Sequence, residues 1–225
     1  MPESIAADHR PAPDARLEEM ALLRRNEAIR KHFDSVALHW DSHQDNVQLR
    51  QLIFRWLSRA GLTSDETVLD IGCGTGLSTG AILSALSPQG RILAVDLSAK
   101  MLLRAAAKHA DPRCAYLQGT VQRLPLPSAT VDRALAFSAW PHFENVDICL
   151  MEIHRILKTG GMLHIWHHDS RDTIDEIHRR IGGIIAEHRA PRPLELMNQC
   201  VRAGYDILEL YDHADGFRLS VKKRT

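Results

Sequence analysis

A short apolar strand that runs directly into a glycine turn constrains this chain more than any other stretch. Val68–Ile71 reads as a buried strand, and the run DIGCGTG that begins at Asp70 repeats glycine at positions 72, 74 and 76. Alternate glycines remove every Cβ from one rim of the turn, so the backbone can reach positive φ and a ligand can lie directly on it. The dinucleotide fingerprint would need glycine where Leu77 stands, which disfavours a nicotinamide oxidoreductase.

Length and composition favour one soluble domain with a sizeable core. The chain has 225 residues, 44% of them hydrophobic, with 28 basic and 28 acidic side chains. This balance does not suggest nucleic acid as a partner. The apolar runs are shorter than a membrane span, and the N-terminus does not resemble a signal peptide, so a cytoplasmic protein is the default expectation. The four cysteines form no C-x-x-C pair, so we expect free thiols.

Alternation of strand and helix patterns along the chain predicts a mainly parallel sheet with helices on both faces. Residues 1–13 are expected to form a mobile leader, residues 14–62 an N-terminal helical lid or cap, and residues 63–225 the main domain, with a cap helix around 172–190. Strands are expected at 68–71, 91–96, 114–118, 131–137, 162–166, 207–211 and 217–221. Helices are expected at 14–32, 47–60, 77–86, 99–109, 146–157, 174–188 and 194–203, and a turn at 158–161.

The pattern D-x-G-x-G-x-G, carried by Asp70, Gly72, Gly74 and Gly76, resembles the nucleotide-binding motif of the class I S-adenosylmethionine-dependent methyltransferases. Further ordered motifs, including LKTGG from Leu157, extend the resemblance over roughly residues 68–165. The resemblance implies a doubly wound, mainly parallel seven-stranded α/β sheet whose last strand is antiparallel. It also implies S-adenosyl-L-methionine as the cofactor.

Asp96 is the second expected anchor of this cofactor. It ends the strand that follows the glycine turn, about twenty residues on, where a carboxylate can accept hydrogen bonds from both ribose hydroxyls. In the family an acid after the third strand accepts the adenine amino protons, whereas Thr120 stands at that position here. By resemblance the cofactor-binding set is Asp70, Gly72, Cys73, Gly74, Gly76, Asp96, Leu97, Met101, Thr120, Val121 and Ser138.

Histidines gather at the ends of the fourth and fifth predicted strands. His142 and His167 are our candidates for catalytic residues that touch the methyl acceptor, for example as a general base. His167, Asp172 and His178 could instead form a divalent-metal site, since i,i+3 spacing through Asp175 would let Asp172 and His178 share parts of one helix face. We favour the simpler interpretation, in which polar residues at a strand end and on a helix face solvent.

The leading interpretation is a methyltransferase that acts on a small molecule, similar to the ubiquinone/menaquinone C-methyltransferase group. The alternative is a catalytically idle cofactor- or metal-binding regulatory or partner protein on the same fold. The expected partner is a small-molecule methyl acceptor, without nucleic acid and without a membrane span. The sequence leaves open the acceptor atom (carbon, oxygen, nitrogen or sulfur) and the oligomeric state.

Overall fold

The computed structural model, which describes residues 13–43 and 46–225, contains a seven-stranded sheet in the order β3-β2-β1-β4-β5-β7-β6. Strands β1 to β5 run parallel, and β7 pairs antiparallel with both β5 and β6, as predicted. The strands are β1 (Thr67–Ile71), β2 (Arg91–Asp96), β3 (Cys114–Gln118), β4 (Val131–Phe137), β5 (Leu157–His167), β6 (Tyr205–His213) and β7 (Gly216–Lys223). The predicted leader, apart from Pro13, lies outside the described residues.

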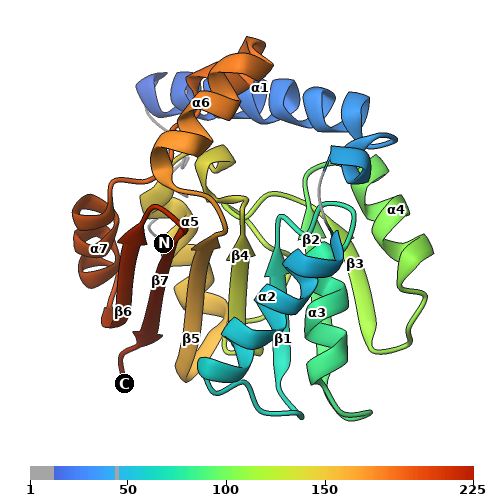
Figure 1. Ribbon diagram of the computed structural model, residues 1–225. Helices are drawn as coiled ribbons and strands as arrows, with labels where there is room; N and C mark the ends of the chain where they lie inside the picture. Colours follow the sequence, from blue (N-terminus) through green and yellow to red (C-terminus); the bar gives the residue numbers. More distant parts are fainter. Residues whose placement is uncertain (1–12, 44–45) are drawn as a thin grey trace, which may run out of the picture.

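Helices cover both faces of the sheet because alternate strand residues point to opposite sides. In β1, Leu69 and Ile71 pack into one core cluster with α5 and α7, whereas Val68 packs into a second cluster with α2 and α3 (Figure 1). The helices are α1 (Pro13–Val36), α2 (Asn46–Arg59), α3 (Leu77–Ala85), α4 (Ala99–Lys108), α5 (Val146–Ile156), α6 (Arg171–Ile181) and α7 (Pro193–Arg202), with short 3-10 helices η1 (Trp40–His43), η2 (Trp140–His142) and η3 (Gly183–Glu187).

The segment expected to form one N-terminal cap divides into two parts with different positions. Helix α1 lies across the carboxyl ends of the parallel strands (Figure 1), where it contacts α4 and η3. Helix α2 packs against α3 on the flank of the sheet, where Ile53, Trp56 and Leu57 are buried in the core. The burial of this apolar face makes α2 part of the layered domain, so only α1 and η1 lie where a lid would.

The structure differs most from the predicted elements at two places. The helix expected over residues 174–188 is two helices, α6 and η3, because Gly182 and Gly183 adopt positive φ and end the α-helical turn. The turn expected at residues 158–161 lies inside β5, where Leu157 pairs with Val131 and Met162 pairs with Arg133. Residues 158–161 of β5 thus stand opposite the single residue Asp132 of β4, and the strand continues on either side of this irregularity.

None of the described helices is long and apolar enough to cross a membrane.

A buried arginine joins the sheet to the loop that precedes β1. The Arg133 side chain is 2% exposed, and its guanidinium donates to both carboxylate oxygens of Glu66, at 2.7 and 3.0 Å. A third nitrogen of the same side chain lies 2.7 Å from Nε2 of His164. A buried charge without its partner is costly, so we expect this pair to be sensitive to the loss of one member.

We predict that Glu66→Gln lowers the free energy of unfolding by about 3 kcal/mol, because the substitution leaves the Arg133 charge buried without a counter-charge. Urea unfolding followed by circular dichroism measures this loss. Glu176→Gln is the matched control, since Glu176 pairs with Arg179 and Arg180 on an exposed helix face and should cost about 1 kcal/mol or less. Equal losses in the two variants would contradict the prediction.

Candidate functional site

The carboxylate of Asp96 organises the crevice at the carboxyl ends of the strands. One of its oxygens accepts a hydrogen bond from the Gly74 backbone N–H at 2.9 Å, and the other accepts from the Ser98 N–H at 2.8 Å. Each oxygen keeps a further lone pair, so both could still accept from a hydroxyl of a bound ligand. Burial raises the pKa of Asp96 to about 6, although the two backbone hydrogen bonds oppose this shift.

Asp70 lies beneath the glycine turn instead of in the cavity. It is fully buried, and its carboxylate accepts hydrogen bonds from the hydroxyls of Ser78 and Thr79, at 2.7 to 2.9 Å. Both hydroxyls belong to the first turn of α3, so Asp70 fixes this helix to the end of β1. Burial raises the pKa of Asp70 to about 6. These bonds hold the turn in position, and a direct role of Asp70 toward the cofactor stays a prediction.

The three glycines of the turn have different surroundings. Gly72 and Gly74 line the main cavity, and a Cβ at Gly74 would meet only the Trp40 ring nitrogen, at 4.0 Å. A Cβ at Gly76 would come within 2.9 Å of the His109 ring and 3.2 Å of Ala105, both in or next to α4. Gly74 thus presents a bare backbone to the cavity, whereas Gly76 permits close packing of α3 against α4.

The main cavity contains most of the predicted cofactor residues. Apart from Asp70 and Gly76, the whole set lines it: Gly72, Cys73, Gly74, Asp96, Leu97, Met101, Thr120, Val121 and Ser138. Leu97, Met101 and Val121 offer an apolar slot next to the acceptor at Asp96, which is the chemistry that an adenine ring joined to a ribose requires. The residues present fit S-adenosylmethionine, and the role of each stays a prediction.

Gln122 also lines this cavity, and sequence reasoning missed it. Its amide Nε2 donates to the Glu144 carbonyl at 2.7 Å, while its Oε1 is buried without a hydrogen-bond partner. A buried acceptor left in this state is costly unless a ligand donates to it. The signal available in the sequence was an amide two residues beyond Thr120, where the expected acid is missing.

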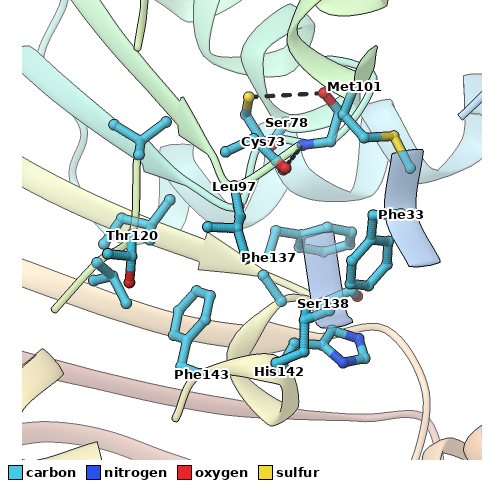
Figure 2. Close-up of a pocket in the computed structure, with 18 of the residues that line it drawn as sticks. Phe33, Cys73, Ser78, Leu97, Met101, Thr120, Phe137, Ser138, His142 and Phe143 are labelled. Atoms are coloured by element: carbon cyan, nitrogen blue, oxygen red, sulfur yellow. Dashed lines mark hydrogen bonds between the residues drawn. The ribbon is translucent and has the colours of Figure 1, made fainter. Parts of the chain in front are cut away.

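A second cavity adjoins the first on the side of α6. The two share the side chains of Phe33, Trp40, Ser138, His142 and His168. Figure 2 shows the rings of Phe33, Phe143 and His142 gathered around the main cavity with Ser138. His167 and His178 line only the second cavity, together with isoleucines of α6 and η3. The structure therefore brings His142 to both cavities and His167 to one.

Burial keeps the imidazoles of this region uncharged at neutral pH. It lowers the pKa of His142 well below the usual value, and the neighbouring His178, His188 and His167 lower it further. Burial likewise lowers the pKa of His167 to about 3. A neutral imidazole has one nitrogen with a free lone pair, so each ring could accept a proton from a substrate.

The alternative metal site is not assembled. Asp172 is exposed, whereas His167 and His178 are buried. Within residues 13–43 and 46–225, no group of three histidine, cysteine, aspartate or glutamate side chains is placed to hold a metal ion. The predicted helical spacing exists in α6, but Asp172 and His178 lie six residues apart and do not share the buried face of the helix.

All four cysteines are free, as predicted.

Polar contacts hold the N-terminal segment over the cavities. Asp41 in η1 accepts a hydrogen bond from the Thr75 hydroxyl at 2.6 Å, and Asp34 in α1 accepts from the Ser98 hydroxyl at 2.6 Å. These contacts hold the segment that carries Phe33 and Trp40, two residues that line both cavities. Movement of this segment as a lid stays a prediction.

Sequence comparisons relate the central part of the chain to methyltransferases. Residues 69–165 match a family described as a methyltransferase domain, and residues 18–114 match the protein-L-isoaspartate(D-aspartate) O-methyltransferase family. A ubiquinone/menaquinone biosynthesis C-methyltransferase from Rubrivivax gelatinosus is 30% identical over 61% of this chain and 54% of its own length. A trans-aconitate 2-methyltransferase from an Azoarcus species is 38% identical over 48% of this chain and 42% of its own length. The chain spans less than two thirds of the length of either relative.

Solved structures show the same fold. A putative methyltransferase from Haloferax volcanii, in complex with the Trm112 methyltransferase activator, superposes with a TM-score of 0.71 at 18% identity, over 86% of this chain and 98% of that one. The [4+2]-cyclase SpnF superposes with a TM-score of 0.63 at 18% identity, over 78% of this chain and 81% of that one. Because these identities are low and a cyclase shares the architecture, the fold alone does not establish the reaction.

We predict that S-adenosylhomocysteine binds most tightly above pH 6 and more weakly as the pH falls below about 6, because the ribose hydroxyls need an ionised Asp96 as acceptor. Isothermal titration calorimetry between pH 5 and pH 8 measures this dependence. At pH 8, Asp96→Asn should weaken binding by roughly 10- to 100-fold, the equivalent of about 1.5–3 kcal/mol for hydrogen bonds to a charged group.

Asp70 could produce the same pH dependence, because its carboxyl titrates in the same range. The Asp96→Asn variant tests this, since it keeps Asp70 and removes only the Asp96 carboxyl. The affinity of the variant should therefore be nearly independent of pH between 5 and 8. If the variant keeps the pH dependence of the wild-type protein, Asp96 is not the titrating acceptor.

Proposed function

Because the chain belongs to the class I S-adenosylmethionine-dependent methyltransferase family, we propose that it transfers the methyl group of S-adenosylmethionine to a small molecule. The bound cofactor would supply an activated methyl group on a positively charged sulfur. The chain then has to align the two reactants and, where the acceptor atom carries a proton, remove that proton.

The observation that carries this proposal is the contact between the two cavities. The main cavity has the bare glycine backbone, the Asp96 acceptor and the apolar slot of a cofactor site. The second cavity adjoins it across Phe33, Trp40, Ser138, His142 and His168, which line both cavities. Two adjoining cavities with different linings suit a donor and an acceptor that must approach each other closely.

His142 is the residue that we propose as the general base, since its ring borders both cavities and is uncharged at neutral pH. His167 contacts the acceptor from the far side of the second cavity, where its Nε2 is buried without a hydrogen-bond partner. A buried, unpaired imidazole nitrogen can recognise a polar group of the acceptor at low cost, because the nitrogen is already removed from water.

The lining also limits the charge of the acceptor. No lysine or arginine side chain lines either cavity within the described residues, and Asp169 adds a negative charge to the second one. An acceptor with several carboxylates would enter without a counter-charge, which is unfavourable in a buried site. We therefore propose an uncharged, largely apolar small molecule with an ionisable hydroxyl or comparable group, and not nucleic acid.

We predict that His142→Ala lowers kcat by about 100-fold or more, because the variant has no base beside the reacting atoms, while His167→Ala mainly raises KM for the acceptor. The assay follows formation of S-adenosylhomocysteine with a panel of phenols, quinols and carboxylic acids, trans-aconitate included. His213→Ala is the control, because His213 is exposed in the β6–β7 hairpin and lines neither cavity. Both site variants should bind S-adenosylhomocysteine as the wild-type protein does.

Wild-type turnover in both variants would remove the two histidines from the reaction. A preference for trans-aconitate over the phenols would contradict the proposed acceptor class. Tight binding of S-adenosylhomocysteine with no transfer to any acceptor of the panel would favour the alternative, a catalytically idle cofactor-binding protein. Failure to bind it at all would overturn the proposal.

A further inference from the structure

A pair of histidine rings in direct hydrogen-bond contact lies at the edge of the two cavities. Nδ1 of His142 lies 2.7 Å from Nδ1 of His188, the residue that follows η3. Two neutral imidazoles can share such a bond only if one ring donates and the other accepts. The direction of this hydrogen bond decides which nitrogen of His142 is left unprotonated, with a lone pair that can accept a proton from a substrate. The neighbours of His188 determine that direction.

The backbone of His188 is fixed independently of its ring. Nδ1 of His178 donates to the His188 carbonyl oxygen at 3.1 Å, and this nitrogen must carry the proton because a carbonyl only accepts. The His188 N–H donates to the Ile185 carbonyl at 3.0 Å. His188 is 5% exposed, so its ring has a single environment and does not exchange its partners with water.

Glu144 stands behind the His188 ring. Its Oε1 lies 3.9 Å from Nε2 of His188, which has no other partner in its buried position. The Glu144 carbonyl accepts hydrogen bonds from Gln122 and from the Cys149 thiol, so this residue is held in place. A carboxylate attracts an N–H group and repels a lone pair, so it favours the form of His188 that carries its proton on Nε2.

Arg25 in α1 weakens the attraction between the Glu144 carboxylate and the Nε2–H group of His188 but does not reverse it. Its Nε lies 3.0 Å from Oε1 of Glu144, and another of its nitrogens lies 3.2 Å from Glu187. The charged side chains around the His188 ring are thus two carboxylates and one guanidinium. The imidazoles of His142 and His178 also lie next to the ring, and burial keeps both neutral.

We propose that Glu144 and His188 hold His142 in the tautomer that carries its proton on Nδ1 and leaves Nε2 with a free lone pair. A His188 ring protonated on Nε2 has its own lone pair on Nδ1, so it must accept, and His142 must donate through Nδ1. The His142 ring makes no other hydrogen bond among the described residues, and it lines both cavities. Nε2 is then the nitrogen that can take a proton in the cavities.

This inference rests on the proposed function in one respect, namely that His142 serves as the base. His188 and Glu144 are then positioning residues: they touch neither reactant and act through the His142 ring. After proton uptake, His142 would carry protons on both nitrogens and would still donate to His188 through Nδ1. The positive charge would be stabilised by the neutral ring and, beyond it, by Glu144.

Long-range ¹H–¹⁵N correlation spectra of protein labelled with ¹⁵N-histidine, recorded at pH 7.5, read the tautomer of His142 directly. The His142 signals are identified by their absence in His142→Gln. In the wild-type protein we expect a protonated Nδ1 and an unprotonated Nε2. In His188→Phe, which keeps a ring but removes the acceptor, the proton of His142 should move to Nε2, the form that free histidine prefers.

Glu144→Gln gives a second, milder variant should His188→Phe not fold, as judged from the backbone amide spectrum. Removal of the carboxylate should produce a mixture of both tautomers of His142. His213→Phe is the matched control and should leave the His142 signals unchanged. A wild-type protein with the His142 proton on Nε2 would overturn the proposal, as would an unchanged tautomer in folded His188→Phe.

The spectra need no methyl acceptor, so they decide this inference separately from the proposed function. In the transfer assay, His188→Phe should lower kcat by about tenfold with unchanged KM and unchanged affinity for S-adenosylhomocysteine. A purely structural role of His188 would instead alter the affinity as well. Absence of transfer in the wild-type protein, together with the expected tautomer, would contradict the proposed function alone.

Discussion

The Asp96 carboxylate is the interaction on which the rest of the site depends. It joins the end of β2 to the glycine turn through Gly74 and to the start of α4 through Ser98. The Ser98 hydroxyl in turn donates to Asp34, which anchors α1 above the strand ends. One buried carboxylate therefore links the floor of the main cavity to the segment that covers it. Its burial raises its pKa to about 6, so the carboxylate is mainly ionised, and the better hydrogen-bond acceptor, above that pH.

In the second cavity, burial determines the charge of the histidine side chains. Imidazoles packed among aromatic and aliphatic side chains lose their charge at neutral pH, and a neutral ring is both a base and a hydrogen-bonding group. Arginine in the same positions would stay charged and would call for an anionic acceptor. The uncharged histidines at the ends of β4 and β5 are therefore one reason why we propose an uncharged substrate.

Several elements could be predicted because their signals are local. Strands β2, β3 and β4 have the expected bounds, since each is an apolar run between turn residues. Asp96 was predicted from its distance to the glycine turn, because the carboxyl ends of neighbouring parallel strands meet at the same edge of the sheet. The break between α6 and η3 was missed, although Gly182 and Gly183 mark it, because helical periodicity continues across the pair.

The sequence by itself determined the order of the elements, the glycine turn and the strand ends at which polar side chains would gather. Only the tertiary structure decided which of these side chains meet: Asp70 with α3, Gly76 with α4, and His142 with His188, 46 residues away. The physical reason is that periodicity and spacing describe neighbours along one strand or helix. Contacts between loops depend on how whole elements pack, and no local pattern records that packing.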